Sequence, residues 1–242
     1  MNNLGLPPII QGGMGAAVSS WYLARTVANE GQLGVVSGTA LETVVTRRLQ
    51  NGDEGGHMQE ALAHFPYPEV AEEILAKFYK PEGRQGKPFR PMRRLSLEAH
   101  KEHDQLAVAS NFVEVWLAKQ SGNGKVGINF LEKLQTATPA ALYGAMLAGV
   151  DAILMGAGIP REIPKLMTDF SQGKPGQLSI DSDRPAGMAA PILEFNPLES
   201  FGKAPELPRP AFLAIVTAEV LASYLARDEV TRPDGFVVEH FM

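Results

Sequence analysis

The stretch PPIIQGGMG at residues 7–15 sets the expected fold of this chain. Its two isoleucines, Ile9 and Ile10, predict a short buried strand, and the glycines after them predict a turn where bare backbone can lie against a flat ligand. Ser19 or Ser20 is a suitable cap for the helix that follows. Cofactors and phosphates bind where a strand ends and a helix begins, so the stretch predicts either a ligand site or a tight turn that holds no ligand.

Apolar runs of strand length alternate with helical segments along the rest of the chain. This alternation predicts a parallel sheet that is covered on both faces. With the segment at Ile9 and Ile10 we count six strands, the others being at residues 33–38, 124–130, 151–155, 211–216 and 235–239. Helices are expected at residues 21–30, 41–49, 138–147, 160–170 and 218–227.

Two insertions interrupt this alternation within what we expect to be a single domain over residues 1–242. The first, at about 53–122, predicts helices at residues 69–80 and from about 96 to 120. The second, at 173–210, is rich in Pro and Gly and predicts a small hairpin from residues 177–181 and 191–195. Each insertion follows a helix and precedes a strand, so we expect both to leave from the amino ends of the strands, away from the usual active-site face.

Small or polar residues follow several of the predicted strands directly. Gly12, Gly13 and Met14 follow the first, Gly38 follows the second, and Asn129 ends the third. In a parallel barrel these positions converge on one face, where active sites are built. The small residues leave room for a planar ligand, and the Asn129 amide can both donate to and accept from a ring edge. The alternative for Asn129 is a structural role in capping a loop.

Composition limits the function classes. The chain has 242 residues, a net charge of −5 and no cysteine. The acidic balance argues against nucleic-acid binding, and the lack of cysteine excludes disulfides, thiolate metal sites and cysteine nucleophiles. The N-terminus lacks the pattern of a signal peptide, and the apolar runs are too short to span a membrane. We therefore expect a soluble cytoplasmic protein with neither nucleic acid nor membrane as its partner.

Seven segments in chain order resemble the nitronate monooxygenases, also called 2-nitropropane dioxygenases. They are PIIQGGMG at 8–15, LGVVSGTALETVVTRRLQNGDEGGHM at 33–58, SNFVEVWLAK at 110–119, VGINFLEK at 126–133, LYGAMLAGVDAILMGAGIPREIP at 142–164, FLAIVTAEVLASYLAR at 212–227 and DGFVVE at 234–239. These enzymes are FMN-dependent TIM barrels, related to the flavin-containing enoyl-ACP reductases. The resemblance covers essentially the whole chain.

The resemblance implies an α/β fold of the TIM-barrel type, (β/α)8, with inserted helices and with FMN at the strand tips. Gly12, Gly13 and Met14 would pack on the isoalloxazine ring, and Gly38 would lie beside it. Asn129 would hydrogen-bond the ring or the ribityl chain. The implied activity is oxidation of a nitronate or nitroalkane by dioxygen, as an FMN-dependent oxidoreductase.

The end of the chain departs from the family pattern. Family members continue beyond the sixth strand into a Gly-Gly-His segment, which carries the catalytic base, and into two more strands whose loops hold the FMN phosphate. This chain ends Val238-Glu239-His240-Phe241-Met242. We therefore expect about six of the eight barrel strands, no assignable catalytic residue and impaired turnover. His240 is more simply a solvated residue than a substitute base.

Three further expectations concern partners and alternatives. An incomplete barrel exposes strand edges, so we expect a homo-oligomer or a complementing chain that supplies the remaining strands. Two other functions stay open: a flavin enoyl-reductase-like component of a lipid or polyketide synthase, and a non-catalytic half-barrel.

His100 and His103 lie among acidic residues and could ligate a metal, but a solvated charged face is the simpler interpretation.

Overall fold

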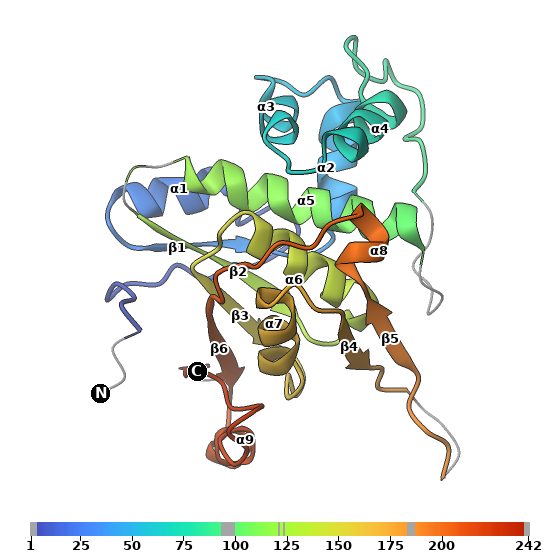
Figure 1. The fold of residues 1–242 in the computed structure, drawn as a ribbon. Helices are drawn as coiled ribbons and strands as arrows, with labels where there is room; N and C mark the ends of the chain where they lie inside the picture. The colour runs from blue at the N-terminus through green and yellow to red at the C-terminus, as the bar shows by residue number, and fades with distance from the viewer. Residues whose placement is uncertain (1–3, 93–99, 121, 123, 183–186, 240–242) are drawn as a thin grey trace.

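The computed structural model describes residues 4–92, 100–120, 122, 124–182 and 187–239. Its centre is a five-stranded parallel sheet in the order β1-β2-β3-β6-β7 (Figure 1). The strands are β1 (Leu33–Ser37), β2 (Lys125–Leu131), β3 (Ala152–Gly156), β6 (Ala211–Val216) and β7 (Gly235–Val238). These are five of the six strands predicted from the apolar runs.

The strands pair in the order in which they occur along the chain. Because crossovers between parallel strands are right-handed, this order places the connecting helices on one face of the sheet. The connecting helices are α1 (Trp21–Asn29), α2 (Leu41–Gln50), α5 (Lys101–Lys119), α6 (Thr138–Leu147), α7 (Ile163–Ser171) and α9 (Glu219–Leu225). Within the described part of the chain, no helix combines the length and apolarity needed to span a membrane.

The two faces of the sheet are buried in different ways. Alternate strand residues such as Val36, Ile128 and Phe212 pack into one large core with the helices. The residues between them, including Val35 and Leu154, form a second cluster whose further cover comes from apolar side chains such as Leu4 and Leu6. Both faces of the central strands are therefore covered, as the alternation predicts, but the helices cover only one of them.

The predicted first strand, at Ile9 and Ile10, is reduced to one bridge between Ile10 and Leu33. The Gln11 backbone N–H donates to the Leu33 carbonyl at 3.0 Å, but the next strand N–H, on Val35, donates to the Gln11 side chain instead, also at 3.0 Å. The Gln11 side chain thus takes the place of the next backbone hydrogen bond between the two strands. The prediction that this strand is buried is wrong, since Ile9 is 61% exposed and Ile10 is 38% exposed.

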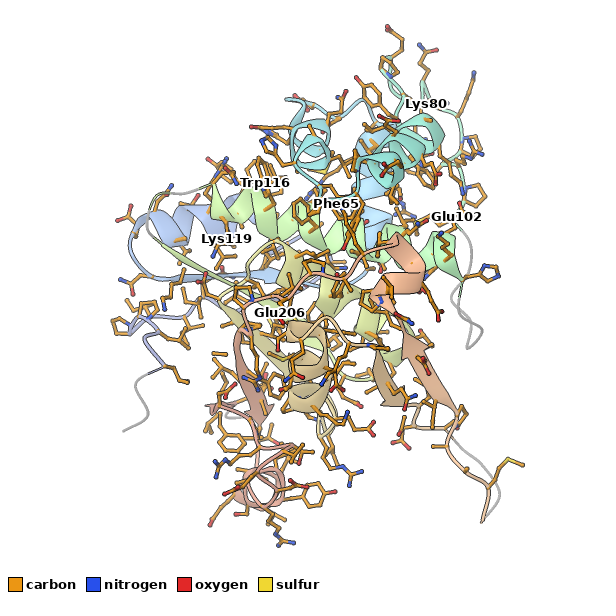
Figure 2. All side chains as sticks on the ribbon, viewed as in Figure 1. Phe65, Lys80, Glu102, Trp116, Lys119 and Glu206 are labelled. Atoms are coloured by element: carbon orange, nitrogen blue, oxygen red, sulfur yellow. The ribbon has the colours of Figure 1, made fainter. Side chains whose placement is uncertain are left out.

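The first insertion builds a second layer of helices on the outside of the first. It contains α3 (His57–Ala63), which the sequence reasoning did not find, and α4 (Pro68–Phe78), close to the helix predicted at residues 69–80. Figure 1 shows both lying over α2 and α5, and Figure 2 shows Phe65, from the link between them, above α5. The start predicted for the next helix, at about residue 96, lies outside the described residues, and α5 is described from Lys101 onward.

The second insertion forms the predicted hairpin. Its strands β4 (Gly176–Ser179) and β5 (Ile192–Phe195) pair antiparallel, and the short helix α8 (Pro197–Phe201) follows. The hairpin is fixed by aromatic side chains: the rings of Phe195 and Phe170 lie 5.6 Å apart, and both contact Tyr143 of α6.

Gly144 lets α6 lie against α5 at close range. A Cβ at this position would overlap the carbonyl group of Val108 in α5. We therefore expect Gly144→Ala to lower the free energy of unfolding by about 1–3 kcal/mol, although alanine is the better helix former. Urea denaturation measures the change. Gly12→Ala is the control, because its added Cβ would meet only Met14 Cγ, at 3.8 Å; equal losses in both variants would contradict the close-packing argument.

Candidate functional site

The glycine-rich loop that follows Gln11 is held in one shape by its own side chains. The Ser19 hydroxyl donates to the Gly12 carbonyl at 3.1 Å and accepts from the Met14 N–H at 3.0 Å. Ser19 therefore orders the loop rather than capping α1. Ser20 occupies the N-cap position without a side-chain cap bond, and the Trp21 N–H is bound instead by the Glu114 carboxylate, at 3.0 Å. The predicted serine cap is wrong because a carboxylate from α5 takes that place.

The loop glycines have different reasons to be glycine. A Cβ on Gly13 would lie 2.7 Å from Val35 Cγ1 and from the Val36 carbonyl oxygen, and one on Gly38 would overlap the Phe130 ring. Internal packing therefore accounts for these two glycines. Gly12 is open, and Met14 beside it is 62% exposed. Of the four predicted site residues in these two loops, Gly12 and Met14 are therefore the two that internal packing does not explain.

Asn129 lies at the carboxyl end of β2, where the sequence predicted a ligand contact. Its Nδ2 donates to the Gly13 carbonyl at 2.8 Å, so the strand end and the glycine loop are joined directly. The side chain is buried, and its Oδ1 has no hydrogen-bond partner among the described residues. An unpaired buried acceptor costs about 1–3 kcal/mol, which a ligand N–H would relieve.

A cavity of about 380 Å³ opens on the helix side of the same strand ends. Gly38 is the one predicted site residue in its lining. Most of the wall is apolar, and two ionisable side chains, Glu42 of α2 and His103 of α5, face the space. The remaining lining residues are Ala40, Thr43, Met92, Phe130, Leu131, Leu134, Ala137, Thr138 and Ala141.

Glu42 and His103 are the ionisable residues that the sequence reasoning missed at this edge. The pKa of the Glu42 carboxyl is raised by its burial, which outweighs the lowering by its own backbone N–H and by the His103 imidazole. The interpretation of His103 as part of a solvated face is wrong, because its side chain is only 12% exposed. Since α5 runs into a parallel strand, its first turn must lie at the carboxyl ends of the strands, and this topological rule could have found His103.

Both insertions return to the carboxyl edge, contrary to expectation. Met92 and His103 come from the first insertion and line the 380 Å³ cavity. The hairpin of the second insertion borders a neighbouring cavity of about 310 Å³ that also contains Glu132 and Glu162. In that cavity the Glu162 carboxylate accepts from the Ser179 N–H and hydroxyl, both at 2.9 Å. The insertions leave from the amino ends, as predicted. The first must cross to the carboxyl ends because α5 begins there, and the second reaches them through its hairpin.

Figure 2 labels a residue at each end of α5, and these two residues show which end of the helix lies at which edge of the sheet. Lys119, at the last turn, binds Asp151 at 2.7 Å, just before β3 begins. Glu102, at the first turn, lies at the opposite end, on the side of the β4–β5 hairpin. His103 is therefore at the carboxyl end of the sheet.

Two of the other histidines, His57 and His64, pack against tryptophan rings. His57 packs on Trp21 with ring centroids 4.8 Å apart, and His64 stacks on Trp116 at 4.5 Å. His240 lies outside the described residues. Within the described ranges, no group of three His, Asp or Glu side chains is placed to hold a metal ion.

No protein-family model matches the chain, and no curated protein has a detectably similar sequence. The functional argument therefore rests on the site itself.

Proposed function

We propose that the chain is an FMN-dependent oxidoreductase of the nitronate monooxygenase type, which oxidises nitronates or nitroalkanes with dioxygen. In this proposal the five-stranded sheet is part of a (β/α)8-type barrel, and FMN binds at the carboxyl ends of its strands. The strand order and the one-sided helix layer support the barrel. The observation that carries the flavin proposal is the unpaired, buried Asn129 Oδ1 beside the glycine loop.

The residues at this edge fit part of a flavin. The ring has both N–H and carbonyl groups at one end, and Asn129 offers a free acceptor to such an edge. Gly12 has open space at its Cα, and the exposed Met14 side chain can cover an apolar ring face. At Gly13 and Gly38, other protein atoms already occupy the space where a Cβ would lie, so a flavin ring cannot pack there. In this proposal these two glycines only shape the backbone of the site.

FMN, when bound, supplies the redox chemistry; the protein binds, orients and shields the ring. The Asn129 Oδ1 would hold the ring edge, because the bond from Nδ2 to the Gly13 carbonyl already fixes the orientation of the amide. Ser19 and Gln11 hold the loop in shape before the ligand arrives, which lowers the entropy cost of binding. A nitronate has already lost its α-proton, so its oxidation needs no base from the protein, whereas a neutral nitroalkane requires one.

The activity test uses the full chain mixed with FMN and follows oxygen consumption. We expect turnover of propyl-2-nitronate and little or none of neutral 2-nitropropane. Free FMN at the same concentration is the control. If the chain binds FMN but consumes no oxygen with the nitronate, and instead reduces an enoyl thioester with a nicotinamide donor, the enoyl-reductase alternative replaces this proposal.

Asn129→Leu isolates the contribution of the amide. The variant keeps the size of the side chain and removes both polar atoms, so we expect FMN affinity to fall about tenfold, the loss of one to two hydrogen bonds. Asn111→Leu is a matched control, because Asn111 is also buried with an unpaired Oδ1 but lies in the middle of α5. An equal loss of affinity in both variants would contradict a specific role for Asn129.

A further inference from the structure

The 380 Å³ cavity between α2, α5, α6 and the end of β2 has the composition of a binding site for a small apolar molecule. Such sites occupy roughly 300–1,000 Å³ and combine apolar walls with a few placed polar groups. Here the walls include Phe130, Leu131 and Leu134. The Thr138 hydroxyl already donates to the Leu134 carbonyl at 3.2 Å. Among the described residues that line the cavity, the ionisable groups that can meet a ligand are Glu42 and His103.

The two ionisable groups are close enough to interact but are not bonded to each other. The charge of His103 acts on the Glu42 carboxyl, yet among the described residues no hydrogen bond or ion pair joins the two side chains. His103 Nδ1 also lies 3.9 Å from the Asp104 carboxylate. Both side chains line the same cavity as each other, Glu42 and His103, so a ligand that occupies it can contact both.

We propose that this cavity binds an apolar molecule whose head group is a carbonyl oxygen, held by Glu42 and His103 together. The site goes beyond the proposed flavin surface and does not depend on it. It lies on the helix side of the sheet, whereas the Asn129 side chain and Gly13 lie on the other face.

The chemistry of the pair selects the head group. Burial raises the pKa of the Glu42 carboxyl, so the group tends toward its protonated form and can donate a hydrogen bond. The His103 imidazole carries an N–H in either of its neutral tautomers. A carbonyl oxygen accepts from two such donors. A plain hydrocarbon would leave both polar side chains without a partner.

The test measures binding of three probes with the same chain length to the full protein, without added flavin. 2-Octanone carries a neutral carbonyl, octanoate carries a carboxylate, and octane carries neither. We expect the better of the two oxygen-bearing probes to bind about tenfold more tightly than octane, with a shift of the His103 ring resonances in NMR spectra. Whether the ketone or the acid binds more tightly decides between a neutral carbonyl and a carboxyl ligand.

Variants show whether the pair makes the difference. Glu42→Leu and His103→Leu are each expected to weaken the preferred probe about threefold to tenfold and to leave octane unchanged. Glu42→Ala and His103→Ala serve if either leucine variant fails to fold. Glu69→Leu and His100→Leu are the matched controls, because Glu69 is an exposed first-turn glutamate of α4 and His100 immediately precedes α5 outside the cavity lining.

Three results would overturn the proposal: equal affinity for octane and the oxygen-bearing probes, no effect of the Glu42 and His103 variants, or no binding of any probe to the folded protein. None of these bears on the flavin surface, which is tested by FMN titration. Failure of one site is therefore distinguishable from failure of the other.

Discussion

Replacing Arg48 with methionine is expected to lower the free energy of unfolding by about 3–5 kcal/mol, because it leaves a buried carboxylate without its counter-charge. Arg48 of α2 pairs with Glu114 of α5, whose side chain is only 1% exposed. The same carboxylate accepts from the Trp21 N–H at 3.0 Å. One ion pair thus ties α1, α2 and α5 together, and denaturant unfolding monitored by circular dichroism measures its loss.

The pH dependence of this loss identifies its cause. Burial raises the pKa of Glu114 above its usual value of 4.5, although Arg48 opposes the rise. A carboxyl whose pKa is raised by folding binds its proton more tightly in the native state than in the unfolded state. Its contribution to the free energy of unfolding is therefore fully present below the pKa of the unfolded state, and it is lost as the pH rises through the pKa of the folded state. Without Arg48 the folded pKa rises further. The Arg48→Met penalty should therefore be larger at about pH 7 than at about pH 4.

Two controls accompany the Arg48 variant. Arg47→Met removes a neighbouring exposed arginine and should change stability by much less. The double variant Arg48→Met/Glu114→Leu removes both charges and should recover most of the lost stability, because the desolvation cost disappears with the carboxylate. A double variant as unstable as Arg48→Met alone would show that packing of the arginine, rather than its charge, supports the fold.

Phe170→Ala is expected to cost about 3–5 kcal/mol, the range for truncating a fully buried phenylalanine. Phe170 has no exposed surface and contacts the rings of Tyr143 and Phe195 edge-on. Gly176 faces it so closely that a Cβ there would lie 2.7 Å from the ring. The substitution removes the contact that anchors the β4–β5 hairpin to α7, so the hairpin should become more accessible to proteolysis as well.

Thermal unfolding and limited proteolysis check this prediction together. Val220→Ala is the control, since Val220 in α9 is 81% exposed and its truncation should stay within about 0.5 kcal/mol. A Phe170→Ala protein with wild-type stability would mean that the aromatic cluster does not hold the hairpin.

Local pattern predicted the regular elements well. The apolar runs at residues 33–38, 124–130, 151–155, 211–216 and 235–239 all form strands within a residue or two of their expected bounds. Pairing in chain order is what the TIM-barrel expectation implies; the handedness of the crossovers alone would also allow an order that reverses within the sheet. The hairpin of the second insertion was also predictable, because its two short runs flank a Pro- and Gly-rich segment.

The predictions that failed depend on contacts between residues that are far apart in the sequence. The segment at Ile9 and Ile10 stops pairing because the Gln11 side chain takes the Val35 N–H, 24 residues away. The serine cap fails because Glu114, 93 residues from Trp21, binds the start of α1. Neither partner is visible in a local pattern, since each depends on how α5 and β1 pack after folding.

The candidate site was half predictable. The rule that parallel strands end at a common edge correctly brought Asn129 and Gly13 together, and they share a 2.8 Å hydrogen bond. The same rule was not applied to the insertions, so Glu42 and His103 were not recognised as neighbours of Gly38 in one cavity.

The most direct measurement of the central claim is a titration of the full chain with FMN, followed by quenching of flavin fluorescence. We predict saturable binding of one FMN per chain, a shift of the flavin absorption bands and competition by riboflavin, since the proposed contacts are to the ring. Absence of binding by folded protein at millimolar FMN would contradict the account, because the unpaired Asn129 acceptor and the glycine loop would then have no flavin to hold.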